Sequence, residues 1–143
     1  MDHSKTSSPL SNAEFMLSGD LFSQWLGIEL MEIQEKYCKI KMGIRPEMIN
    51  GLKTVHGGII FSFADSALAF SSNNTAQASV ALNCVINFTT AVREGEEIFA
   101  ESKLISDTRK TGVYDILITN QEKKVVASFR GTVYKLGRSI YDL

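Results

Sequence analysis

Two spacings of apolar residues divide this chain, and the boundary between them falls near Asn73. From Gly57 to about Asn73 the residues are apolar almost all round and include no proline, which predicts a long helix surrounded by other structure. After this segment apolar and polar residues alternate, as in strands with one buried face. Four strands are expected there, over residues 79–89, 96–106, 111–121 and 123–136. In the first of them, one face is expected to carry Val80, Leu82, Cys84, Ile86 and Phe88.

The beginning of the chain is polar and then turns amphipathic. Residues 1–11 have no sustained apolar run and are expected to form a disordered leader. Two short helices are expected next. Ser11 or Asn12 is placed to cap the first, and Asp20 is placed to cap the second, which ends at Gly27.

The segment between these helices and Gly57 is expected to supply two strands and a loop. Apolar residues alternate with lysines over residues 37–44, which predicts a half-buried strand. Residues 46–55 begin with a proline and contain an Asn-Gly pair, both typical of loops. The whole order predicts an α+β domain, in which an antiparallel sheet wraps around one long central helix. A chain of 143 residues is expected to form one such domain, spanning residues 1–143.

Composition excludes some classes of partner and predicts the cellular compartment. A net charge of -1 gives no reason to expect nucleic acid or an acidic membrane as partner, and no segment approaches the roughly 20 apolar residues of a membrane span. Cys38 and Cys84 lie far apart, as expected for core residues in a reducing cytosol. With no signal peptide at its start, the chain is expected to be cytoplasmic. His3 and His56 are the only histidines, so a three-ligand zinc site is poorly supplied, and no metal or cofactor is expected.

The residues that are best suited to catalysis or ligand binding cluster around the start of the long helix. Gly57 and Gly58 would let a ligand approach the backbone, where the first N–H groups of a helix lack internal acceptors and favour negative charge. Such donors suit a developing oxyanion. Asp65 is an acid inside an apolar helix, which suits a general base or a nucleophile. Asn50 could orient a water or a carbonyl.

Helix geometry sets a condition on this chemistry. Asp65 follows Gly57 by eight residues, which is about 12 Å along a helix at 1.5 Å per residue. One reacting carbonyl cannot lie about 3 Å from both groups. If both act on the same bond, they come from different chains, and two antiparallel helices side by side would bring them together. A functional site therefore requires at least a dimer.

Each of these residues also has a structural interpretation. Asp65 could pair with a lysine or an arginine across a subunit interface. His56 could hold the Asn50 loop to the start of the helix. Phe61 and Phe63 could belong to the core instead of a pocket.

Two segments carry a resemblance to a known family. "NGLKTVHGGIIFSFADSALA" (residues 50–69) resembles the N-G-(x)4-H-G-G-(x)6-D segment of hotdog-fold acyl-CoA thioesterases, and "TRKTGVYDILITNQEKKVVASFRGTVYKLG" (residues 108–137) is similar to their phenylacetate-degradation (PaaI-type) branch. The resemblance implies the hotdog fold, dimers that share a continuous sheet, and usually tetramers. It also implies hydrolysis, at the dimer interface, of aryl-acetyl (phenylacetyl or hydroxyphenylacetyl) or other short and medium acyl-CoA thioesters.

The resemblance also implies roles for particular residues. Asp65 matches the catalytic acid, as nucleophile or as general base, and Gly57 matches the N–H that polarises the thioester carbonyl. Asn50 matches the residue that orients water or thioester, and His56 matches the residue that positions this loop. The candidates for contacts with the substrate are Gly58, Phe61, Arg93 and Lys110, of which Phe61, together with Phe63, could close the pocket against long chains.

Two other functions stay open from the sequence. A hotdog hydratase or dehydratase would carry its acid four or five residues before the histidine, or a His-Phe-Pro loop, whereas here Asp65 follows His56 by nine residues. A non-catalytic acyl-CoA-binding or sensing protein on the same fold is the other alternative. Such a protein would normally carry an output domain.

Overall fold

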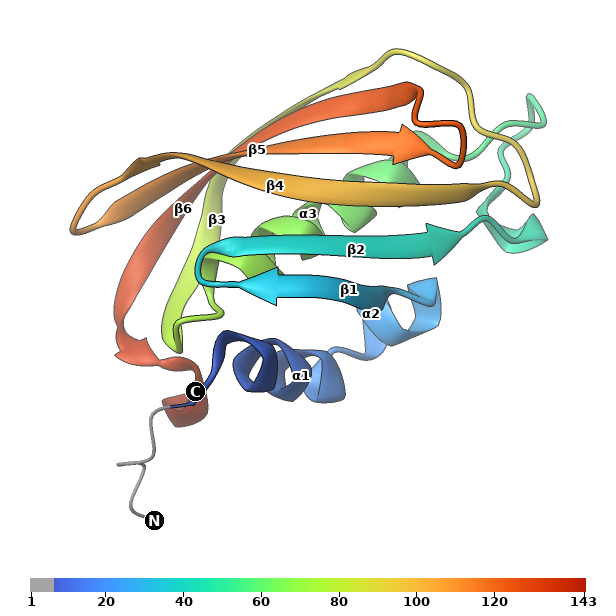
Figure 1. The fold of residues 1–143 in the computed structure, drawn as a ribbon. Coiled ribbons are helices and arrows are strands. Elements are labelled where there is room, and N and C mark those ends of the chain that lie inside the picture. The colour runs from blue at the N-terminus through green and yellow to red at the C-terminus, as the bar shows by residue number, and fades with distance from the viewer. Residues whose placement is uncertain (1–6) are drawn as a thin grey trace.

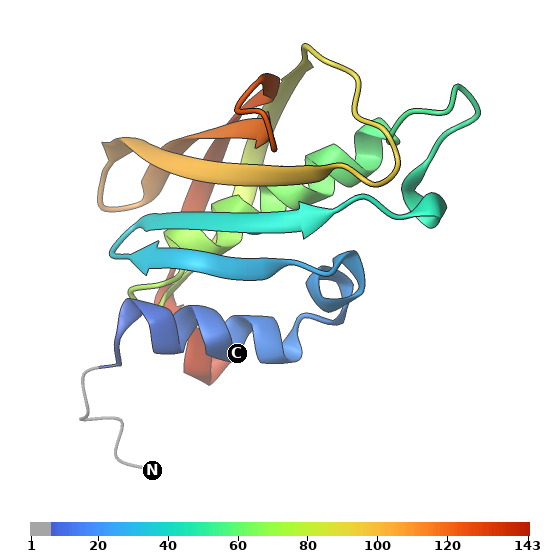
Figure 2. The same cartoon turned by 45° about the vertical axis from the view of Figure 1, so that its right-hand side comes forward.

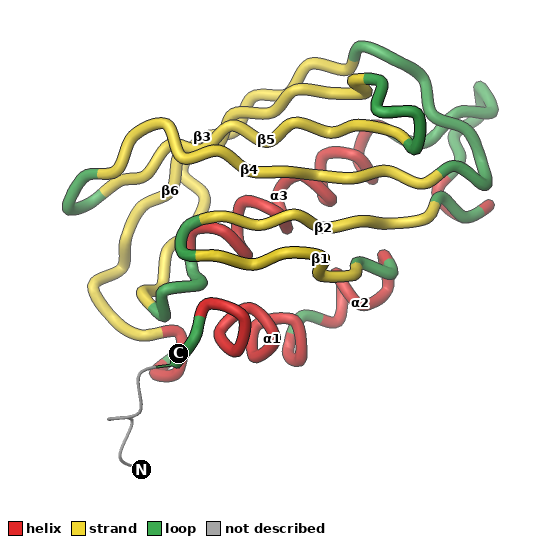
Figure 3. The backbone as a smooth tube through the Cα atoms, in the orientation of Figure 1, coloured by secondary structure: helices red, strands yellow, loops and turns green. Residues whose placement is uncertain are grey.

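The computed structural model describes residues 7–143 as one antiparallel sheet curled around a long helix (Figures 1 and 3). The helices are α1 (Pro9–Gly19), α2 (Leu21–Leu26) and α3 (Gly57–Ser72), with short 3-10 helices η1 (Pro46–Met48) and η2 (Ile140–Asp142). The strands are β1 (Glu29–Gln34), β2 (Tyr37–Gly43), β3 (Gln77–Phe88), β4 (Glu97–Asp107), β5 (Thr111–Asn120) and β6 (Val125–Ser139). The predicted α+β hotdog architecture is confirmed.

The sheet has the strand order β1-β2-β4-β5-β6-β3, and every described pair is antiparallel. The chain leaves the sheet after β2, runs through α3 and returns as β3 at the far edge, so α3 lies in the hollow of the curled sheet (Figure 2). Within the described chain β3 pairs only with β6, which leaves its other edge unpaired. Val80, Leu82, Val85 and Phe88 on this strand are all at least half exposed. A long apolar edge of this kind favours pairing with another strand.

A β-bulge in β3 corrects one expectation about its faces. The register with β6 shifts between Ala81 and Asn83, so Leu82 is the extra residue. Because one inserted residue reverses the alternation, Cys84, Ile86 and Phe88 share the face that looks at α3, whereas Val80 lies on the other. The expectation that all five apolar residues share one face is therefore wrong.

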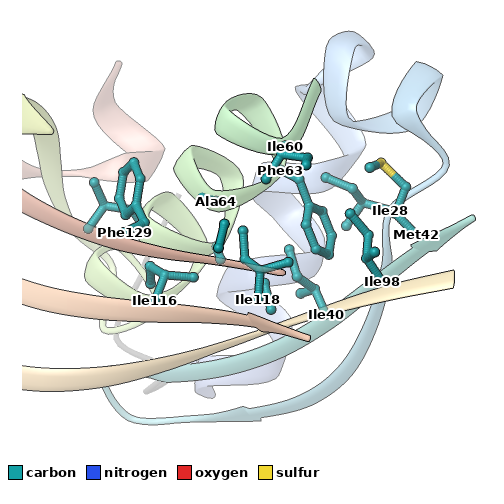
Figure 4. Packing of buried hydrophobic residues seen from close by; sticks show 14 of the residues in the cluster. Ile28, Ile40, Met42, Ile60, Phe63, Ala64, Ile98, Ile116, Ile118 and Phe129 are labelled. Carbon is teal, nitrogen blue, oxygen red and sulfur yellow. The ribbon is translucent and has the colours of Figure 1, made fainter. Parts of the chain in front are cut away.

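The core lies between α3 and the concave face of the sheet. Phe63 and Ala64 point from α3 toward isoleucines of β2, β4 and β5 (Figure 4), and Ile60 belongs to the same buried cluster. On β6, Gly131 allows the closest approach, because a Cβ there would come within 2.6 Å of the Leu68 side chain. The helix is thus held at a fixed depth in the sheet, with Phe63 wholly inside the core.

The N-terminal helix begins earlier than the sequence predicts. Ser8, and not Ser11 or Asn12, is its N-cap, because Pro9 favours the first helical position and the Ser8 hydroxyl accepts the N–H of Ser11 at 3.1 Å. The expected leader is therefore helical from residue 9, and residues 1–6 lie outside the described part of the chain.

Asn12 explains why this polar segment is ordered. It is buried, its amide donates to the carbonyl of Asn74 at 2.8 Å, and it accepts a 2.6 Å bond from the hydroxyl of Tyr141. These bonds tie α1 to the end of α3 and to η2. The second short helix matches its prediction, with Asp20 as N-cap and Gly27 in the left-handed conformation after its last residue. In the described part of the chain, no helix is long and apolar enough to cross a membrane.

Candidate active site

The first turn of α3 leaves one backbone donor unused. His56 is the N-cap, and its Nδ1 accepts the N–H of Gly58 at 3.0 Å. The His56 carbonyl accepts the N–H of Ile59 at 2.9 Å. The N–H of Gly57 has no acceptor among residues 7–143. Because the helix dipole places partial positive charge at this end, the Gly57 amide is a free donor for an oxyanion.

Gly57 faces the edge strand. A Cβ at this position would lie 3.2 Å from the ring of Phe88, so the helix start and the end of β3 are already in close contact. Gly57 and Phe88 line a hollow of about 340 Å³, together with Thr54 and Val92. Gly57 therefore lies in a hollow that borders the end of the edge strand β3.

Asn50 organises the loop before the helix. Its Oδ1 accepts the N–H groups of Leu52 and Thr54 at 2.8 and 3.2 Å, and its Nδ2 donates to the Thr54 hydroxyl at 3.2 Å. The backbone N–H of His56 donates to Met48 at 2.8 Å. The backbone of His56, and not its side chain, thus ties this loop to the helix. One N–H of the Asn50 amide has no acceptor in the described chain.

Asp65 lies on the half-buried face of α3 without a hydrogen bond or an ion pair in residues 7–143. Burial raises the pKa of its carboxyl group, and the negative charge of Asp20 raises it further. Asp65 lines a second hollow of about 200 Å³ beside Ser79 and Val80 of β3. The structural interpretation, a pairing with a lysine or an arginine across a subunit interface, would need a cation from a second copy, because residues 7–143 supply none.

The two groups lie in separate hollows. Gly57 belongs to the first and Asp65 to the second, and both hollows border β3. The eight residues between them lie in one uninterrupted helix, so the predicted rise of about 12 Å applies. A single protomer cannot place both groups on one carbonyl.

The other predicted residues are dispersed. Gly58 is exposed next to Gly57, and its N–H is engaged by His56. Phe61 is half-buried and packs edge-on against Phe129, with ring centroids 5.5 Å apart. Phe63 is fully buried and so belongs to the core, which was the structural interpretation of this residue.

The two predicted cations are far from each other. Arg93 is exposed in the turn before β4, near the Gly57 hollow that Val92 lines. Lys110 is exposed in the turn after β4, at the other end of this strand. Eleven residues of strand span about 33 Å, so within one protomer these two side chains do not contact the same phosphate group.

Two neighbours of Asp65 were not predicted for the site. Asp20 was expected only as a helix cap, although it also acts on the pKa of Asp65. Cys84 of β3 is close enough for the charge of Asp65, after burial, to raise the pKa of its thiol. Neither proximity has a signal in the sequence, because both depend on packing. No group of three potential metal ligands occurs among the described residues.

A sheet wrapped around one long helix, with an acid in that helix and an amide at its start that both lack partners in residues 7–143, is the arrangement of hotdog-fold thioester hydrolases. The comparison with known families agrees with this class. The chain belongs to the thioesterase superfamily, whose family profile matches residues 52–127.

Individual relatives support this assignment. The acyl-coenzyme A thioesterase PaaI of Escherichia coli (strain K12) is 36% identical over 129 residues, which cover 90% of this chain and 92% of PaaI. The solved structure of E. coli PaaI, from the phenylacetic acid degradation operon, has a TM-score of 0.90 at 35% identity and covers 92% of this chain and 95% of that chain. A mutant of PaaI from Thermus thermophilus has a TM-score of 0.78 at 28% identity, covering 82% of this chain and all of its own. The resemblance found in the sequence is thus confirmed.

We expect Asp65→Asn to raise the free energy of unfolding at neutral pH. The raised pKa means that the folded chain binds the Asp65 proton more tightly than the unfolded chain does. Wild-type stability attributable to this group is therefore present at acid pH and is lost as the pH rises through the raised pKa. The variant should be the more stable protein above that pKa, and the difference should shrink in acid.

Thermal unfolding of both proteins from about pH 4 to about pH 8 measures this difference across the range in which a carboxyl with a raised pKa titrates. A variant that is less stable than the wild type at neutral pH would contradict the expectation. That result would indicate a cationic partner for Asp65 in the assembled protein.

Proposed function

We propose that this protein hydrolyses acyl-CoA thioesters at sites formed between two protomers. The observation that carries the proposal is the separation of two unpartnered groups on one helix. The Gly57 N–H and the Asp65 carboxylate both lack partners in the described chain and lie in different hollows beside the same free edge. The two groups can act on one substrate if a second copy of the chain places its Asp65 beside the Gly57 N–H of the first.

The free edge of β3 suggests how the copies meet. Antiparallel pairing of β3 with β3 of a second protomer would satisfy the unpaired edge and cover Val80, Leu82 and Phe88. A two-fold axis through that edge would set the two α3 helices antiparallel. The Gly57 hollow of one protomer would then lie beside the Asp65 hollow of the other. Further association of two dimers into a tetramer is part of this proposal.

The chemistry follows from the two halves. The Gly57 N–H, at the positive end of α3, binds the thioester oxygen and stabilises the negative charge that develops there. Asp65 of the second protomer either removes a proton from an attacking water or attacks the carbonyl itself. In the first case the water oxygen bonds to the carbonyl carbon, the C–S bond breaks, and CoA leaves as the thiol after taking up a proton. In the second case a carboxylate oxygen of Asp65 bonds to the carbonyl carbon, the C–S bond breaks and CoA leaves as the thiolate, which takes up a proton; water then hydrolyses the resulting anhydride, which releases the acid and restores Asp65.

The raised pKa of Asp65 fits either role. A carboxylate that holds its proton more tightly is a stronger base and a better nucleophile at neutral pH. His56 and Asn50 support the other half of the site, since one caps α3 and the other fixes the preceding loop. The spare N–H of Asn50 is available to a water or to the thioester.

An aryl-acetyl group is the acyl group that we propose. E. coli PaaI, at 36% identity, is named an acyl-coenzyme A thioesterase and comes from the phenylacetic acid degradation operon. Within this chain, Phe88 is the aromatic side chain that lines the Gly57 hollow, and Phe61 is a second, half-buried aromatic residue on α3 that packs against Phe129. The two free cysteines agree with the expected cytoplasmic location.

Asp65→Asn should lower CoA release from phenylacetyl-CoA by a factor of about 10² to 10⁴, the usual contribution of a positioned acid–base group. A thiol reagent that detects free CoA provides the assay. Asp142→Asn is the matched control, because it makes the same change at an exposed position in η2, and it should leave turnover unchanged. Near-normal turnover by folded Asp65→Asn protein would show that the acid is structural.

Phenylacetyl-CoA or a ring-hydroxylated analogue should exceed palmitoyl-CoA in kcat/KM. An aromatic contact favours an aryl ring by about 0.5–1.5 kcal/mol, up to roughly tenfold. The same assay run over aryl and straight-chain CoA esters measures the profile. A profile that rises with chain length and ignores aryl esters would contradict this substrate class while leaving thioester hydrolysis intact.

A further inference from the structure

Helix α2 is fixed to α3 by a short chain of hydrogen bonds next to the acid. Asp20 caps α2 by accepting the N–H and the hydroxyl of Ser23, at 2.9 and 2.5 Å. The Ser23 hydroxyl also lies 2.8 Å from the hydroxyl of Ser66 on α3. Both serines are buried, and Ser66 is the residue after Asp65. Two hydrogen bonds in series therefore connect the Asp20 carboxylate to the turn of α3 that carries the acid.

We propose that Asp20 is a positioning residue of the active site, which uses the Ser23–Ser66 contact to hold a second negative charge beside Asp65. The inference rests on the proposed function for its catalytic meaning. Its structural part rests on the contacts alone. A cap that served only α2 would not need a buried serine bonded to the neighbouring helix.

The surroundings of Asp65 leave Asp20 as the dominant charge. Among the described titratable groups, Asp20 from α2 and Cys84 from β3 interact with the Asp65 carboxylate. The strands β2, β4, β5 and β6 also pack against α3, and none of them contributes a charged group that acts on the pKa of Asp65. No described cation opposes the effect of Asp20.

The consequence is a base whose strength is adjusted from a neighbouring helix. Burial is the larger cause of the raised pKa of Asp65, and the negative charge of Asp20 adds to it, because a charge nearby disfavours ionisation of a second carboxyl. Once ionised, Asp65 binds a proton more strongly and is the better base. Removing the charge of Asp20 should therefore let Asp65 ionise at lower pH and weaken it as a base.

Asp20→Asn tests this proposal with little disturbance of the fold, because asparagine caps helices about as well as aspartate and can still accept from Ser23. The acid limb of the pH profile of kcat/KM for phenylacetyl-CoA should move to lower pH, by less than about one unit because water screens the two groups. Glu122→Gln is the control, since it removes one negative charge from an exposed turn between β5 and β6, and it should leave the limb in place. Added salt of about 1 M should move the wild-type limb toward that of Asp20→Asn, because the Debye length falls to about 3 Å.

A carboxyl-carbon NMR titration of Asp65 gives the same answer without turnover, so the proposal is tested even if acyl-CoA hydrolysis is not observed. The midpoint for Asp65 should fall in Asp20→Asn and in Asp20→Ser, which keeps a capping hydroxyl, and should stay unchanged in Glu122→Gln. An unchanged midpoint in both folded Asp20 variants, with or without a change in stability, would overturn the proposal. Absent turnover with a shifted midpoint would instead count against the proposed function alone.

Discussion

The distance between the Gly57 amide and the Asp65 carboxylate is the constraint on which this molecule depends. An α-helix cannot be shortened, so eight residues fix these groups about 12 Å apart. The helix cannot bend around a substrate either, because the concave sheet holds it along its length through Phe63, Ile60 and Leu68. The chemistry that either half could support is therefore incomplete in one protomer. If both groups act on the same carbonyl, as we propose, the rise of the helix requires a second copy whatever the substrate is.

The sheet and the site are consequences of the same arrangement. Because α3 separates β2 from β3 in the chain, β3 ends at the far edge of the sheet and stays unpaired on one side. That edge borders both hollows, so pairing there would cover apolar surface and would join two half-sites in one event. The step that removes the free edge also completes the site.

The sequence predicts the parts of this structure that depend on local periodicity. The apolar segment from Gly57 gave α3 almost to the residue, and alternation gave the strands, because both signals come from which face is buried. The bulge at Leu82 could not be predicted, since it depends on how β3 registers with β6. The early start of α1 has a local signal in Ser8 and Pro9, whereas the order of this polar segment depends on the bonds of Asn12 to Asn74 and Tyr141, which are distant in the sequence.

The candidate site divides in the same way. Its residue types and the distance between them follow from the sequence, whereas the proximity of Asp20 and the withdrawal of Phe63 into the core depend on tertiary packing. Local patterns indicated which groups could act. Only the packed structure shows which of them have no partner.

Complementation between protomers tests the central claim most directly. Gly57→Pro removes the amide proton itself, and proline is well tolerated at the first position of a helix. Gly57→Ala adds a comparable Cβ but keeps the N–H, and so it controls for contact with Phe88. Gly57→Pro and Asp65→Asn should each be nearly inactive alone. The two variants are co-expressed with different tags and purified through both tags. In each mixed dimer one of the two sites should then combine an unaltered Gly57 with an unaltered Asp65. Activity should therefore return to about half that of the wild type in a two-fold dimer. Mixed assemblies as inactive as their parents would contradict a site shared between protomers.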